Sequence, residues 1–278
     1  MASLQHQGRA SYAFFERNWN LTKRYMGWEI VWLFYNIINA LSVTLISKNT
    51  QALGSNVTQA QVDALTLYLL IGTSVWSYLS VTFEGVTDLI NIERWEGTIE
   101  HTFMAPISRF THMIGSCWYA VVHGILFTFV QLIIVASFFH LNLSHANYLT
   151  AVFMLLLGSV SFVGFGIGAA VLPLLYTERG SQMSFIVRAI LLLVSGVYYP
   201  ISVLPGWMQP AASISPATYV LNGLRSGLLD NKPIWSPEIW GDTWPLIIAG
   251  VVSIPAGLWV FGIAERYAKK TGRLKRNG

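Results

Sequence analysis

The charged residues of this chain gather in one short stretch, NIERWEGTIEHTFMAPISRFTHMIG, at residues 91–115. Only 11% of the 278 residues are charged, yet this stretch holds Glu93, Arg94, Glu96 and Glu100 close together. No His and Glu pair stands at the spacing of a metal site, so we expect no metal. Side chains of this kind can bind a charged partner, because complementary charges fix the register of an interface.

The apolar residues of the same stretch predict a short amphipathic helix over residues 91–106. They recur at steps of three and four and form one stripe, which consists of Ile92, Trp95, Ile99 and Phe103. The glutamates and Arg94 lie off the stripe, Gly97 permits close backbone approach, and Pro106 ends the helix. One face of the helix then suits lipid or other helices, and the other suits a charged partner. A surface helix without a partner is the alternative.

Long apolar runs on both sides of this stretch indicate an integral membrane protein. The chain is 54% hydrophobic with a mean hydropathy of +0.51, and it has half the charge of a soluble domain, which carries about 25% charged residues. A bilayer core of about 30 Å requires roughly 20 apolar helical residues. Six segments meet this requirement, at residues 28–46, 64–83, 113–139, 149–175, 183–199 and 244–264. Because the runs are continuous, we expect six transmembrane helices in a single all-α domain over residues 1–278.

The distribution of Lys and Arg predicts the orientation of these helices. With six spans both termini share one side, and of the 17 Lys and Arg residues only Lys48, Arg225 and Lys232 fall on the other. Basic residues favour the cytoplasm, so we place both termini there, in a cell membrane that we expect to be a prokaryotic plasma membrane. Residues 12–27 mix aromatic and basic side chains, which predicts a helix lying flat at the bilayer interface. A frayed basic tail is the alternative.

The segment at residues 200–229 is apolar but broken. One straight helix cannot contain its four prolines, which are Pro200, Pro205, Pro210 and Pro216. We expect two short re-entrant helices that dip back from the exterior, because irregular backbone at membrane depth must be buried in protein or line a cavity.

Three residues inside the spans are further candidates. Gly164 and Gly168 stand four residues apart, where small residues allow helices to approach closely. Helix packing is one interpretation, and a flexible part of a substrate path is the other. His123 lies in the middle of a span and is a functional candidate for that reason. A neutral histidine hydrogen-bonded to a neighbouring helix is its alternative.

Two blocks of the sequence resemble the type-2 ABC exporter permeases, nearest to the drug- and antibiotic-resistance branch. The first block matches their cytoplasmic loop at Glu93, Arg94, Glu96, Gly97, Thr98, Glu100, Pro106, Ile107, Ser108 and Arg109. The second matches their signature after the fifth span at Ser195, Gly196, Tyr198, Tyr199, Pro200, Leu204, Pro205, Gly206, Trp207, Pro216, Thr218, Tyr219 and Arg225. Both blocks stand in the expected order and on the expected sides of the membrane.

The resemblance implies a division of labour between chains. Such permeases pair with a second permease copy, identical or related, and bind two ATPase subunits. The loop is then a coupling helix in contact with the ATPase, through Glu93, Arg94, Glu96, Gly97, Thr98 and Glu100. The segment after the fifth span forms the outer gate, for which we select Tyr198, Tyr199, Pro200, Trp207 and Tyr219. An interfacial aromatic belt is the alternative for these aromatic residues.

The expected function is ATP-driven export of an amphipathic or hydrophobic compound. The chain has no G-x-x-x-x-G-K-[ST] loop, so we expect ATP and Mg to bind only to the ATPase partner and no cofactor or nucleic acid to bind here. A polysaccharide or lipid-linked glycan exporter is the first alternative. An intramembrane lipid-modifying enzyme and an ion-coupled carrier are disfavoured, because the expected spans hold no Asp or Glu away from their ends.

Overall fold

The computed structural model describes residues 4–49, 58–139, 146–176 and 179–272, and within these ranges it contains helices but no strands. The long helices are α1 (Leu4–Arg24), α2 (Met26–Asn49), α3 (Gln59–Thr87), α6 (Arg109–Phe139), α7 (Tyr148–Ala169) and α12 (Pro237–Thr271). The shorter ones are α4 (Leu89–Trp95), α5 (Ile99–Met104), α8 (Val171–Leu175), α9 (Gly180–Val194), the 3-10 turn η1 (Ile201–Val203), α10 (Gln209–Ile214) and α11 (Pro216–Leu228).

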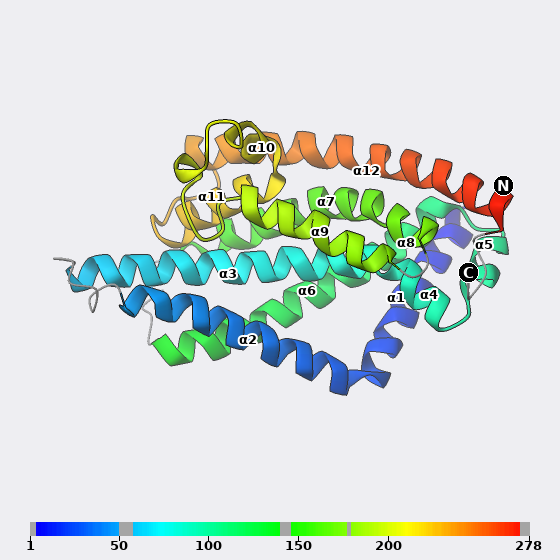
Figure 1. Cartoon of the computed structure of the whole chain (residues 1–278), viewed down its shortest axis with the longest axis horizontal. Coiled ribbons are helices and arrows are strands. Elements are labelled where there is room, and N and C mark those ends of the chain that lie inside the picture. Colours follow the sequence, from blue (N-terminus) through cyan, green and yellow to red (C-terminus); the bar gives the residue numbers. More distant parts are fainter. Residues whose placement is uncertain (1–3, 50–57, 140–145, 177–178, 273–278) are drawn as a thin grey trace.

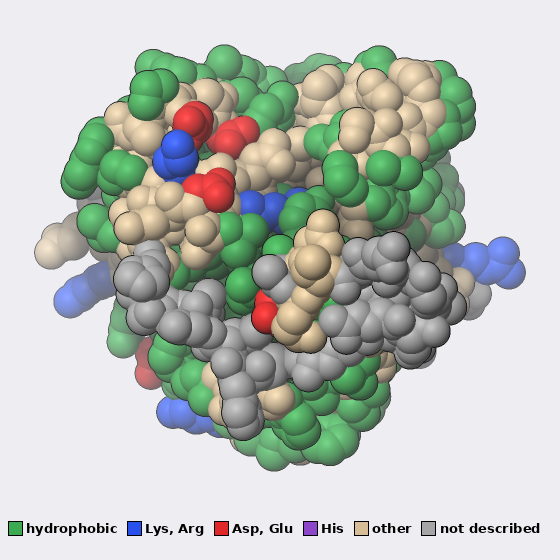
Figure 2. All heavy atoms as spheres, turned by 90° about the vertical axis from the view of Figure 1, so that its left-hand side faces the viewer, with side chains coloured by type: hydrophobic (Ala, Val, Ile, Leu, Met, Phe, Trp, Pro, Cys, Tyr) green, Lys and Arg blue, Asp and Glu red, His purple; other side chains and the backbone are tan. Residues whose placement is uncertain are grey.

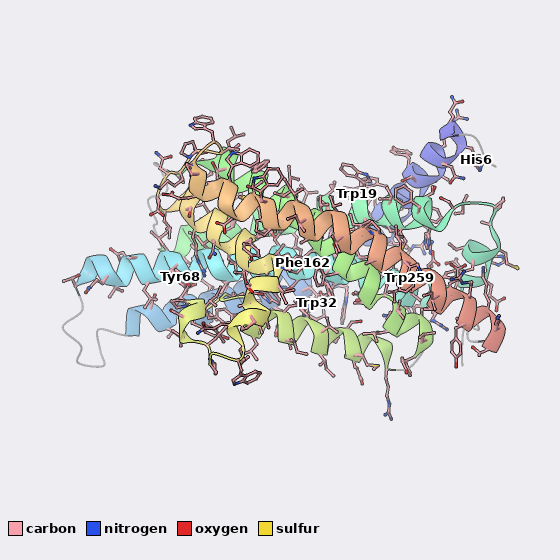
Figure 3. The ribbon with its side chains drawn as sticks, turned by 90° about the horizontal axis from the view of Figure 1, so that it is seen from above. His6, Trp19, Trp32, Tyr68, Phe162 and Trp259 are labelled. Atoms are coloured by element: carbon pink, nitrogen blue, oxygen red, sulfur yellow. The ribbon has the colours of Figure 1, made fainter. Side chains whose placement is uncertain are left out.

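The helices form an elongated bundle with two distinct ends (Figure 1). The start of α1, the end of α12 and the short helices α4 and α5 lie at one end, which we call the loop end. The start of α3 and the helices α10 and α11 lie at the opposite end, which we call the hairpin end. Helix α7 packs against α12, α11 and α3, and α3 also packs against α6 and α2. In Figure 3 the buried Phe162 of α7 lies in the interior, whereas Trp259 of α12 is 68% exposed.

Five of the six expected spans are confirmed as helices long and apolar enough to cross a membrane, counted over the described residues. They are α2, α3, α6, α7 with α8, and α12, so the chain is a multi-pass, all-α membrane protein. Helix α12 extends the expected span at both ends and contains Pro245 and Pro255.

The expected span at residues 183–199 differs from the structure. Helix α9 has only 15 residues and ends at Val194, so at 1.5 Å per residue it covers about 22 Å of the 30 Å bilayer core. The helix ends because Gly196 adopts a left-handed conformation with φ of 69°. The backbone that was expected to continue the span instead turns towards η1.

Two other boundaries shift. Helix α1 begins at Leu4 rather than at residue 12 and packs along α6. The two helices approach closely at Gly115, where a Cβ atom would overlap the carbonyl oxygen of Ser11. At the hairpin end, α11 lies against α7 with Val220 beside Gly158 and Gly227 beside Thr150. The start of α11 therefore lies inside the bundle.

Candidate functional site

The loop between α3 and α6 contains two short helices instead of the one expected over residues 91–106. Helix α4 ends at Trp95, and Gly97 follows with φ of 73°. The amide of Thr98 donates to the Glu93 carbonyl at 2.9 Å and the amide of Gly97 donates to the Arg94 carbonyl at 3.1 Å. These are the two hydrogen bonds of a Schellman motif, in which a glycine terminates a helix. Gly97 therefore ends α4 rather than weakening a longer helix.

This break divides the expected apolar stripe into two parts. Ile99 and Phe103 on α5 are 1% and 4% exposed and belong to the hydrophobic core of the loop end. Ile92 and Trp95 on α4 are 37% and 63% exposed. The prediction of one continuous apolar face is therefore wrong, because the left-handed turn at Gly97 rotates α5 relative to α4.

The prediction that Glu93 and Arg94 lie on a charged outer face is also wrong. Glu93 is fully buried, and its Oε1 atom lies 3.0 Å from Arg17 Nη1 and 3.0 Å from His112 Nε2. Arg94 is 5% exposed and donates from Nη2 to the Leu174 carbonyl at 2.9 Å. Burial lowers the pKa of the Arg94 guanidinium. Both side chains therefore hold the loop against the helix bundle.

Sequence reasoning missed Arg17 and His112 as partners of Glu93. Arg17 lies on α1, 76 residues away, and also donates to the Thr98 hydroxyl at 2.8 Å. Since neither residue stands at a regular spacing from Glu93, no local pattern could have found them. Helix α1 also reaches the end of the loop, where the Ser108 amide donates to Gln7 at 3.4 Å. The N-terminal helix and the loop are thus joined at several points.

The remaining two glutamates differ in exposure. Glu96 is half-buried, receives a hydrogen bond from the Tyr25 hydroxyl at 3.2 Å and lies 3.7 Å from Arg24. Glu100 is exposed on α5. It belongs to the group of exposed loop residues that we call the loop surface, which consists of Trp95, Glu100, His101 and Met104. Trp95 and Met104 are the apolar members of this surface, and Glu100 and His101 are its polar members.

The residues selected for an outer gate lie at the hairpin end but do not form one cluster. Tyr198 is half-buried and packs against the main core, and the Tyr199 hydroxyl donates to the Leu193 carbonyl at 2.6 Å. Pro200 is exposed, and Trp207 is 80% exposed. The Tyr219 hydroxyl donates to the Ser213 carbonyl at 2.6 Å, which fixes α10 on α11.

Tyr219 also lines a groove of about 450 Å³ between α7, α10 and α12. The other lining residues are mostly apolar and are Phe165, Ser213, Ile214, Pro245, Ile248, Ala249, Val252 and Ser253. Figure 2 views the hairpin end, where apolar side chains lie beside polar and backbone atoms and a few acidic and basic side chains. The lining of the groove suits an apolar ligand better than a hydrated one.

Gly164 and Gly168 of α7 face α12. A Cβ atom on Gly164 would overlap the Ser253 side chain, and a Cβ atom on Gly257 would come within 2.7 Å of the Gly164 carbonyl and 3.2 Å of the Gly168 amide. Gly164 and Gly257 thus give room to the opposite helix, as in the helix-packing interpretation, whereas a Cβ atom on Gly168 would meet only the Gly257 Cα atom, at 4.0 Å.

His123 has an acidic partner that sequence reasoning did not find. Its Nε2 atom lies 3.1 Å from Glu29 Oε2 on α2, 94 residues away, and its ring stacks on Tyr119 at 5.4 Å. The pair joins α2 to α6. This arrangement resembles the second interpretation of His123 given above, a histidine hydrogen-bonded to a neighbouring helix. Among the described residues, no three His, Cys, Asp or Glu side chains come together in a group that could hold a metal ion.

Comparison with protein families identifies the family of this chain. The model of the ABC-2 type transporter family matches residues 10–229, which is most of the chain. The match includes α2, α3, α6, α7, the loop and the hairpin end. No curated protein matches the chain.

Proposed function

Because the chain belongs to the ABC-2 type transporter family and is a permease subunit of an ABC exporter, we propose that a separate ATPase drives it through the loop surface. The observation that carries this proposal is the way the loop is held. Glu93 and Arg94 fix it from inside, and Arg17 ties it to α1, so the exposed residues of α5 stand on a supported element. A push on a supported element can reach the helices as a rigid-body movement.

The contact with the ATPase is formed by Glu100, His101, Met104 and Trp95. Central aromatic or Met residues with a few charges around them are typical of interface hot spots. Glu96 contributes at the edge, since it is half-buried and already contacts Arg24. In this arrangement both chain termini and the loop end face the cytoplasm, and the hairpin end faces the exterior.

We propose that the cargo is an amphipathic or hydrophobic compound. The support is the groove beside Tyr219, whose lining is mostly apolar. A strongly hydrated sugar polymer would lose its hydration on such surfaces without gaining hydrogen bonds.

A second permease copy, identical or related, completes the assembly with two ATPase subunits. The support is α2, whose exposed side chains include Trp28, Trp32 and Tyr35. Bilayer lipid or another permease can cover such a face.

Photo-cross-linking tests the contact with the ATPase. A benzophenone amino acid at position 104 should cross-link the full-length chain in its native membrane to an ATP-binding polypeptide. The same group at position 207, which is exposed at the hairpin end, should not. Equal cross-linking from both positions, or none from position 104, would contradict the proposed contact.

A further inference from the structure

Arg225 joins three helices at the hairpin end. It lies on α11 and donates from Nη1 to the Gly196 carbonyl at 3.1 Å and from Nη2 to the Val197 carbonyl at 2.8 Å, both just after the end of α9. Its guanidinium carbon lies 3.5 Å from the centre of the Tyr68 ring on α3. Figure 3 places Tyr68 on α3 near the hairpin end.

The two carbonyl groups need a donor. Gly196 and Val197 are buried in the turn after α9, and a buried backbone carbonyl without a hydrogen-bond donor is costly. A guanidinium supplies several fixed N–H donors and a positive charge at this position. Inside a membrane protein little water is available to replace such bonds, so their loss is costly.

A second residue of α3, Gly72, leaves room for the hydrogen bond between Arg225 and Val197. Gly72 lies one helical turn after Tyr68, and a Cβ atom there would overlap the Val197 carbonyl oxygen and come within 3.0 Å of Arg225 Nη2. The ring of Tyr68 and the missing side chain of Gly72 thus form a cradle for the guanidinium and the carbonyl that it binds.

The turn that Arg225 holds carries the residues selected for the gate. Tyr198 and Tyr199 follow Val197 directly. On the other side of the turn, the hydroxyl groups of Ser195 and Ser215 lie 2.7 Å apart and connect the end of α9 to the start of α11. The end of α9 can therefore move away from α11 only if the hydrogen bonds of Arg225 break, and the two can leave α3 together only if the guanidinium leaves the Tyr68 ring.

We propose that Arg225 is a positioning residue that latches the end of α9 against α3 and so keeps the outer gate closed. This inference rests on the proposed export function in one respect, namely that the turn after α9 belongs to the outer gate of an exporter. The latch itself is a property of this chain and can be measured without cargo or ATPase.

Thiol labelling tests the latch. The chain has one cysteine, Cys117, which is buried on α6 and reports general unfolding. Val197→Cys adds a small side chain at a fully buried position next to the latch. The rate of labelling by a membrane-impermeant maleimide is measured on the full-length chain in lipid vesicles, in this background and after a second substitution.

We expect Arg225→Ala to raise the labelling rate at position 197 at least about tenfold, because it removes two hydrogen bonds from a charged group, while Cys117 stays protected. Gly72→Ala should act in the same direction without changing Arg225. Arg225→Lys should give an intermediate rate, since lysine keeps the charge but loses the planar fork. Gly206→Ala is the matched control, since nothing lies within 4 Å of its added Cβ atom.

An unchanged rate at position 197 in both Arg225→Ala and Gly72→Ala would overturn the proposal. Equal exposure of Cys117 and position 197 in all three latch variants would also overturn it, because Arg225 would then hold the whole fold rather than the turn. If position 104 fails to cross-link to an ATPase but the labelling rates at position 197 change as expected, the proposed function is contradicted and the latch is not.

Discussion

The guanidinium of Arg17 on α1 donates to the carboxylate of Glu93 on α4 at 3.0 Å, across 76 residues of sequence. Glu93 is fully buried and also contacts His112 of α6, so one carboxylate connects the N-terminal helix, the loop and a spanning helix. The loop at the end of α3 is therefore held by α1 and α6 together through one buried side chain.

Removal of the Glu93 charge should destabilise the fold. Glu93→Gln should lower the free energy of unfolding by roughly 2 kcal/mol. This is less than the roughly 3–5 kcal/mol for a fully buried pair, because Arg17 is 26% exposed and can regain water. The melting temperature of the purified chain, followed by tryptophan fluorescence, measures the effect. Glu100→Gln is the control and should melt like the wild type; equal losses in both variants would contradict the internal role of Glu93.

The loop surface should affect binding rather than folding. Met104 is 77% exposed and Glu100 is also exposed, so Met104→Ala combined with Glu100→Ala removes two side chains that lie outside the packed core. We expect at least about tenfold weaker association with the ATPase subunit and an unchanged melting temperature, because truncated hot-spot residues typically cost more than about 1 kcal/mol. Titration of the permease with the ATPase in detergent measures the first quantity. Wild-type affinity in this variant would show that the ATPase binds elsewhere.

Two glycines between α7 and α12, Gly164 and Gly257, should tolerate no side chain. Gly164→Ala should destabilise the fold by roughly 1–3 kcal/mol, because the new methyl group overlaps Ser253 and crowds the α12 backbone. Gly262→Ala on α12 is the matched control, since its Cβ atom meets nothing within 4 Å and alanine favours the helix by up to about 1 kcal/mol. If thermal melting shows both variants to be equally stable, the close packing of α7 on α12 is incorrect.

Much of the architecture could be predicted from the sequence, because long apolar runs require spanning helices. The breaks at the hairpin end also followed from local chemistry, since Pro200, Pro205 and Pro216 cannot continue one helix. The end of α4 at Gly97 had a local signal that was read differently. A glycine two residues after the last helical position is typical of a Schellman motif. In the folded chain this glycine ends the helix, although the apolar periodicity continues beyond it.

The contacts inside the site could not be predicted in this way. Glu93 and Arg17, and likewise His123 and Glu29, meet only after α1, α2 and α6 have packed. A carboxylate in a loop has the same local pattern whether it faces water or a buried arginine. For this reason Glu93 and Arg94 were expected on the outer face, although both are buried.

The His123–Glu29 pair should contribute to the packing of α2 on α6. A double-mutant cycle with His123→Phe and Glu29→Gln should give a coupling free energy of roughly 0.5–3 kcal/mol, as is usual for residues in direct contact. Thermal melting of the four proteins in the same lipid measures it. Strictly additive effects would indicate that the two side chains do not interact.

Co-purification tests the central claim most directly. The full-length chain is tagged and isolated from its native membrane in mild detergent, and ATP hydrolysis by the eluate is measured for the wild type and for the Met104→Ala, Glu100→Ala variant. We predict that a separate ATP-hydrolysing subunit elutes with the wild type and is largely lost from the variant. A wild-type eluate without such a subunit and without ATP hydrolysis would contradict the account.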